Sequence, residues 1–150
     1  FSILIIFSSI SFKYLLPQDS SGVSNKNLKK ILILISIGIS ILGITVLPKI
    51  IPVFFPKFVQ TVDAISIMSI AVIPEAITML YMSKILGKEK SNIILISKLL
   101  SLSILIIGFI IIGPIMGIVG LALIMVLASI SQTSILALSE IKIGERNGTN

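Results

Sequence analysis

Residues 58–87 read FVQTVDAISIMSIAVIPEAITMLYMSKILG, a segment that is almost entirely apolar and yet contains Asp63, Pro74 and Glu75. A helix rises about 1.5 Å per residue, so roughly 20 apolar residues cross the ~30 Å hydrocarbon core of a bilayer. This segment is long enough to cross with a tilt or a kink. Because a carboxylate near the bilayer midplane is costly, Glu75 indicates a site, an ion pathway or a buried partner.

The composition places the chain among integral membrane proteins. Of its 150 residues, 55% are hydrophobic and 12% are charged, and the mean hydropathy is +1.17. Soluble domains carry roughly 25% charged residues. The chain has neither cysteine nor histidine, which excludes disulfides, histidine-based catalysis and the usual zinc sites. We therefore predict that the protein is not an enzyme, and we expect no catalytic, metal-binding or cofactor-binding residues and no cofactor.

Long apolar runs recur along the chain and predict an all-α, polytopic transmembrane helix bundle. A partial first span and four full spans are expected at residues 1–16, 28–47, 58–83, 92–112 and 115–138, followed by a polar tail at 140–150. The centre of the second span alternates with period two, which is typical of a strand. That run is too long for one strand, and an unpaired strand in lipid would leave its backbone groups without partners.

Prolines and small residues predict where the spans end and how they pack. Three prolines are expected to end the second span in an interfacial turn over 48–57, and Gly113-Pro114 is expected to separate the fourth span from the fifth. Small residues form a stripe on one face of the second span, at Ser36, Ser40 and Gly43. A second seam of glycines opens the fifth span, at Gly113, Gly117 and Gly120. Such stripes favour close helix contact, although the first could also line a cavity.

The basic residues predict the orientation of the chain. Nine of the twelve lie at 13–30, at 84–90 and in the tail, whereas the turn at 48–57 carries two. Because positively charged loops stay on the cytoplasmic side, we expect a multi-pass protein of the cytoplasmic (plasma) membrane with a cytoplasmic C-terminus. These residues form no basic stripe, so the expected partner is the lipid bilayer and not nucleic acid.

Three charged residues are candidates for a cavity or an ion pathway: Glu75, Lys98 and Asp63. Pro74 cannot donate a hydrogen bond to the carbonyl four residues before it, so a helix kink is expected beside Glu75. A kink next to a carboxylate is typical of the discontinuous helices that line transport sites. The alternative is a protonated Glu75 that is hydrogen-bonded to a hydroxyl such as that of Thr78.

The other two candidates lie nearer the ends of their spans. Lys98 shares its side of the helix with Ser97 and Ser101 in our interpretation, which favours a polar lining, although a lysine so placed often extends to the interface instead. Asp63 lies near the outer end of its span and is expected to be solvated unless it contributes to the pathway.

Several short motifs carry a family resemblance. They are FFPKFV at 54–59, Ala64-Ile65, Ile73-Pro74, SKILGKEKS at 83–91 and GPIMGIVGLA at 113–122. In their order and spacing these motifs resemble the C-terminal part of polysaccharide-biosynthesis flippases, of the multidrug/oligosaccharidyl-lipid/polysaccharide exporter superfamily. The resemblance covers roughly residues 1–139. Phe58 stands where a tyrosine is usual, and Glu75 stands where a small or hydroxyl residue is expected, so no family role transfers to Glu75.

The resemblance implies a larger helix bundle, built of two related halves, that moves lipid-linked oligosaccharides across the membrane by alternating access. The chain begins inside an apolar run without a methionine, so we expect it to be a C-terminal piece whose partner is the missing N-terminal half. Three alternatives stay open: a cation-coupled multidrug exporter of the same superfamily, a non-transporting membrane anchor or assembly subunit, and a membrane-embedded lipid-modifying enzyme.

Overall fold

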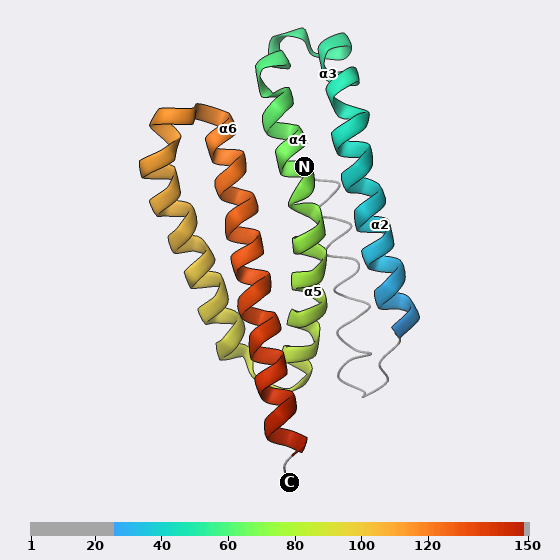
Figure 1. The fold of residues 1–150 in the computed structure, drawn as a ribbon, viewed down its shortest axis with the longest axis vertical. Coiled ribbons are helices and arrows are strands. Elements are labelled where there is room, and N and C mark those ends of the chain that lie inside the picture. The colour runs from blue at the N-terminus through green and yellow to red at the C-terminus, as the bar shows by residue number, and fades with distance from the viewer. Residues whose placement is uncertain (1–25, 149–150) are drawn as a thin grey trace.

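The structure is a computed structural model that describes residues 26–148, and this part of the chain is helical without strands. Its elements are α2 (Lys26–Thr45), α3 (Leu47–Phe54), the 3-10 helix η1 (Pro56–Thr61), α4 (Val62–Ile70), α5 (Val72–Gly87) and α6 (Ser91–Gly148). The all-α prediction is confirmed for this range (Figure 1). The span predicted at 1–16 and the end of the predicted tail lie outside the described residues.

Helix α6 is a hairpin of two antiparallel arms, although its helical assignment is continuous. The chain reverses at Gly117, whose φ of 57° and ψ of −138° are not helical. Residues 91–116 form the first arm and residues 118–148 the second. Ser101 of the first arm donates a hydrogen bond to the carbonyl of Ala128 on the second at 3.2 Å, and Figure 1 shows the two arms side by side.

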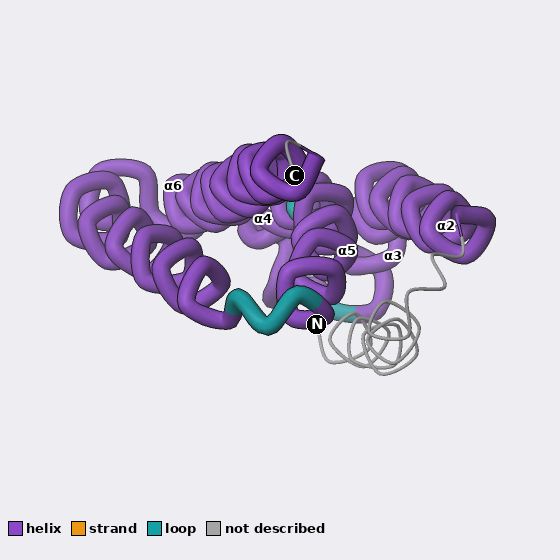
Figure 2. The backbone as a smooth tube through the Cα atoms, turned by 90° about the horizontal axis from the view of Figure 1, so that it is seen from below, coloured by secondary structure: helices purple, strands orange, loops and turns teal. Residues whose placement is uncertain are grey.

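The helices follow one another across the molecule in an order that differs from the chain order. Seen from the side and from below, the order across the molecule is the first arm of α6, the second arm of α6, α4 with α5, and then α2 (Figures 1 and 2). Two apolar clusters hold this arrangement. The first joins α2 to α5 at Leu32, Ala76 and Leu80. The second joins α5 to both arms of α6 at Ile85, Ile94 and Leu136.

Several helices are long and apolar enough to cross a membrane. Two qualify by length and composition, Pro56–Gly87 and Ser91–Lys142, and a third qualifies if α2 and α3 form one bent span. This count of two to three takes α6 as one helix, although its arms are antiparallel. Large apolar side chains are widely exposed on α2 and on both arms, as expected of helices whose surroundings are lipid.

The prolines after α2 bend the chain without unwinding it. Instead of an interfacial turn over 48–57, residues Leu47–Phe54 form helix α3, which is bent by 48° from Lys29–Thr45. Pro48 lies in the first turn of α3, where a missing N–H costs little because that donor has no partner within the helix. The non-helical region is thereby shortened to Phe55 and the 3-10 turn that follows it.

The turn between the arms of α6 also differs from the expectation. Helical structure continues through Gly113-Pro114, and the reversal occurs at Gly117, whose positive φ glycine adopts without a steric cost. Gly120, just beyond the reversal, is buried, and a Cβ there would lie 2.7 Å from the Cβ of Met116. The predicted glycine seam therefore serves the turn itself.

The small-residue stripe of α2 makes a close helix contact, as predicted. Ser36 and Ser40 are buried, and a Cβ on Gly43 would lie 2.6 Å from the Cβ of Ser69 on α4. No larger residue fits at Gly43 without separating the two helices. The stripe thus packs α2 against the central helix pair that carries Glu75.

Candidate functional site

The central helix is interrupted at Ala71, three residues before Pro74. Helix α4 ends at Ile70, α5 begins at Val72, and Ala71 between them donates its N–H to the carbonyl of Met68 at 3.1 Å. Pro74 has no N–H for the carbonyl of Ile70, which explains why the regular pattern fails here. Ala71 keeps right-handed helical angles, so the interruption is mild and Pro56–Gly87 still forms one long helical unit.

Glu75 lies directly after this interruption, on an exposed side of α5. Its neighbours Ala76 and Thr78 are buried against the other helices, whereas Glu75 itself is exposed. Within residues 26–148 its carboxylate makes no hydrogen bond or ion pair. The carboxylate therefore points out of the packed helices instead of into a polar space between them.

A pair of threonines connects Pro74 to the second arm of α6. The hydroxyl oxygens of Thr78 and Thr133 are 2.7 Å apart, and Thr133 Oγ1 is 2.9 Å from the carbonyl oxygen of Pro74. Thr78 can donate to Thr133, whose single proton has two acceptors: the carbonyl of Pro74 and, at 2.8 Å, the carbonyl of Ser129 on its own helix. The alternative stated from the sequence expected Thr78 to bond to Glu75. In the structure its partner is Thr133. The sequence did not single out Thr133, because it is one of several hydroxyl residues in 129–134 and none of them reveals what faces it.

The other two predicted residues lie apart from Glu75. Lys98 is exposed on the first arm of α6, whereas Ser97 is fully buried and Ser101 is 7% exposed. The serines thus face the bundle and the lysine faces away, so the three residues do not share one side of the helix. Asp63 is exposed in the first turn of α4, where a carboxylate interacts favourably with the helix dipole. The structure does not bring the three candidates together.

An ion pair joins α5 to the second arm at the end opposite η1. Lys84 Nζ lies 3.1 Å from Glu140 Oε1 and 5.6 Å from the ring centroid of Tyr81. The two side chains are 34% and 24% exposed, so the pair is partly shielded from solvent. The sequence did not reveal it, because the two partners are 56 residues apart.

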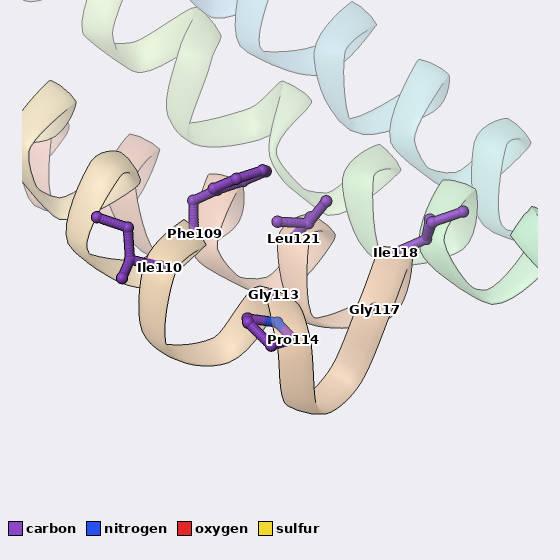
Figure 3. Close-up of a pocket in the computed structure, with 7 residues that line it drawn as sticks. All are labelled: Phe109, Ile110, Gly113, Pro114, Gly117, Ile118 and Leu121. Carbon is purple, nitrogen blue, oxygen red and sulfur yellow. The ribbon is translucent and has the colours of Figure 1, made fainter.

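A largely apolar, open pocket of about 350 Å³ lies at the turn of the α6 hairpin. Figure 3 shows side chains from both arms around it. Its lining residues are Phe109, Ile110, Gly113, Pro114, Gly117, Ile118 and Leu121. None of these lining residues is charged or titratable. The described residues contain no group of three or more His, Cys, Asp or Glu residues that could hold a metal ion.

No protein family, curated protein or solved structure shows significant similarity to this chain.

Proposed function

We propose that this chain is the C-terminal portion of a membrane transporter that moves lipid-linked oligosaccharides or polysaccharide repeat units across the membrane by alternating access. Its described part would contribute four spans: α2 with α3, α4 with α5, and the two arms of α6. At about 1.5 Å per residue, each of these segments is long enough to cross the ~30 Å hydrocarbon core. Exposed apolar side chains along α2 and α6 support contact with lipid.

The distribution of lysines supports an orientation with the C-terminus in the cytoplasm. One end of the molecule holds the start of α2, the turn from α5 to α6 and the end of the second arm (Figure 1). The lysines at that end are Lys29, Lys30, Lys84, Lys88, Lys90 and Lys142. The other end holds Lys49 and Lys57 beside η1, and no charge at the turn of the hairpin. Positively charged ends stay in the cytoplasm, so we propose that the C-terminus faces the cytoplasm and that the chain lies in the plasma membrane.

The observation that carries the transport proposal is the exposed carboxylate of Glu75 beside the interrupted helix. An ionisable side chain that faces lipid within the hydrocarbon region is costly and rare. The side of α5 that carries Glu75 would therefore face water or further protein, as it would at the wall of a central cavity. The missing N-terminal half of the same protein would supply the opposite wall. The resemblance of the motifs supports the substrate class.

The decisive experiment compares Glu75→Gln with Asp63→Asn, which removes a carboxylate from the same helical unit but near its end. Both variants of the full-length protein are reconstituted into liposomes with a labelled lipid-linked oligosaccharide, and the rate of its translocation is measured. We expect Glu75→Gln to slow translocation about tenfold, equivalent to about 1.4 kcal/mol in the barrier. Asp63→Asn should translocate at the rate of the unmodified protein.

Other outcomes would replace this proposal with one of its rivals. Equal rates for both variants would remove Glu75 from the mechanism. Drug efflux without oligosaccharide translocation would identify a multidrug exporter. If neither class of molecule is transported by the intact protein, a membrane anchor or assembly subunit is the better description.

A further inference from the structure

Lys98 is the one exposed cation on the apolar outer surface of the first α6 arm, among the described residues. It lies between large apolar side chains that are each more than half exposed: Leu95 at 59%, Leu99 at 54% and Leu102 at 51%. The adjacent Ser97 is fully buried, whereas Lys98 is exposed. A ligand for the Lys98 ammonium group must therefore reach it from outside the helix bundle.

The direction of the helix determines where this ammonium group lies. Side chains on a helix tilt towards its N-terminus, and α6 begins at the end of the molecule that carries most of the lysines (Figure 1). Lys98 is seven residues beyond Ser91, or about 10 Å along the axis. Its side chain tilts back towards that end, so the charge can reach the interface while its methylene groups stay in contact with the leucines.

The charges around this position are mostly positive and uncompensated. Lys88 and Lys90 are exposed in the turn that precedes Ser91, with Glu89 as the only acidic residue in that turn. No acidic residue occurs between Glu89 and Glu140. Glu140 itself is engaged by Lys84 at 3.1 Å. Within residues 26–148, Lys88, Lys90 and Lys98 make no ion pair, so this end of the first arm is complementary to an anion.

We propose that the outer face of the first α6 arm is a docking surface for an anionic phospholipid. Its phosphate lies at Lys98, and Lys88 and Lys90 lie closer to the membrane surface. Its acyl chain follows Leu95, Leu99 and Leu102. The charge complementarity identifies the headgroup, and the exposed leucines identify the hydrocarbon chain, which a soluble anion lacks. This inference rests on the membrane placement given under the proposed function but not on the transport activity.

The test measures lipid retention by the purified full-length protein. The protein is exposed to equal amounts of phosphatidylglycerol and phosphatidylcholine in detergent micelles, and bound lipids are counted by native mass spectrometry. We expect preferential retention of phosphatidylglycerol, reduced about fivefold by Lys98→Gln, since one basic residue near a membrane surface has an effect of that size. Lys98→Arg should retain the lipid. Lys49→Gln, at the opposite end, is the matched control and should have no effect.

Two outcomes would overturn the proposal: retention by Lys98→Gln that equals retention by the unmodified protein, or an equal loss in Lys49→Gln, which would indicate unspecific attraction. Displacement of the lipid by glycerol phosphate would also overturn it, since the leucines would then contribute nothing. The Glu75→Gln variant should retain phosphatidylglycerol even if it no longer translocates oligosaccharide. Lipid retention and translocation are therefore independent measurements, and either proposal can fail without the other. Extraction of the protein from membranes by carbonate would instead refute the membrane placement itself.

Discussion

The two sides of the central helix pair pack by different means. Towards the second arm of α6, polar groups reach across the interface: Thr78 to Thr133, Thr133 to Pro74, and Lys84 to Glu140. Towards α2, small residues bring the backbones together, with Gly43 against Ser69. The hydroxyls of Ser36 and Ser69 donate to carbonyls of their own helices, at 2.8 Å each.

The difference shows what each kind of contact can specify. The polar contacts fix how α5 and the second arm are aligned along their length. The partners are 55 residues apart in Thr78–Thr133 and 56 residues apart in Lys84–Glu140, so both pairs fit one alignment of the two helices. Glycine and serine contacts instead fix how closely the helices approach, since lipid offers no hydrophobic driving force between helices. Close approach is sensitive to added volume, whereas a single hydrogen bond contributes modestly.

The largest effect is expected from Gly43→Leu, which adds volume where a Cβ alone would lie 2.6 Å from the Cβ of Ser69. We expect thermal unfolding in detergent to show a loss of about 3 kcal/mol, the upper range for overpacking. Gly38→Leu is the matched control on the same helix, because a Cβ at Gly38 meets nothing within 4 Å. Equal stability of the two variants would show that α2 does not pack closely on α4.

A smaller effect is expected from Thr133→Val, which keeps the shape of the side chain and removes its hydroxyl. Thr78, 3% exposed, then loses its partner. We expect a loss of about 1 kcal/mol, as is typical of hydrogen bonds between membrane helices, measured by the same unfolding assay. The neighbouring Ser134→Ala should be neutral, because Ser134 is exposed and bonds to its own helix. If Thr133→Val leaves the stability unchanged, the Thr78–Thr133 contact does not fix the alignment of α5 with the second arm.

The smallest effect is expected at the ion pair. Lys84→Gln and Glu140→Gln, combined in a double-mutant cycle, should give a coupling free energy of about 0.5 kcal/mol, because the partners are partly exposed. Added salt should lower that coupling further. A coupling of several kcal/mol would instead indicate a desolvated pair and would make this contact as decisive as the Gly43 contact.

Local rules predicted much of the architecture. The apolar runs predicted an all-α chain with long helices at 28–47, 58–83, 92–112 and 115–138, and the stripe at Ser36, Ser40 and Gly43 predicted a close contact. Pro74 predicted a kink, whereas the structure shows an interruption at Ala71 that keeps helical angles. The same rules placed two boundaries differently from the structure. The first turn of a helix tolerates proline, so helical structure continues past Pro48. The reversal of the hairpin occurred at Gly117, which has a positive φ, and not at Gly113-Pro114.

The sequence by itself determined that this chain forms long apolar helices with most of its lysines at their ends, because these properties follow from composition and from the spacing of apolar, charged and helix-breaking residues. The small residues of α2 indicated its packed face, but only the tertiary structure decided which sides of α5 and α6 are covered. It turned Glu75 and Lys98 outward, paired Thr78 with Thr133, and joined Lys84 to Glu140. The physical reason is that a helix which is apolar on every side carries no internal signal for its neighbour, so the choice depends on how distant segments fit together.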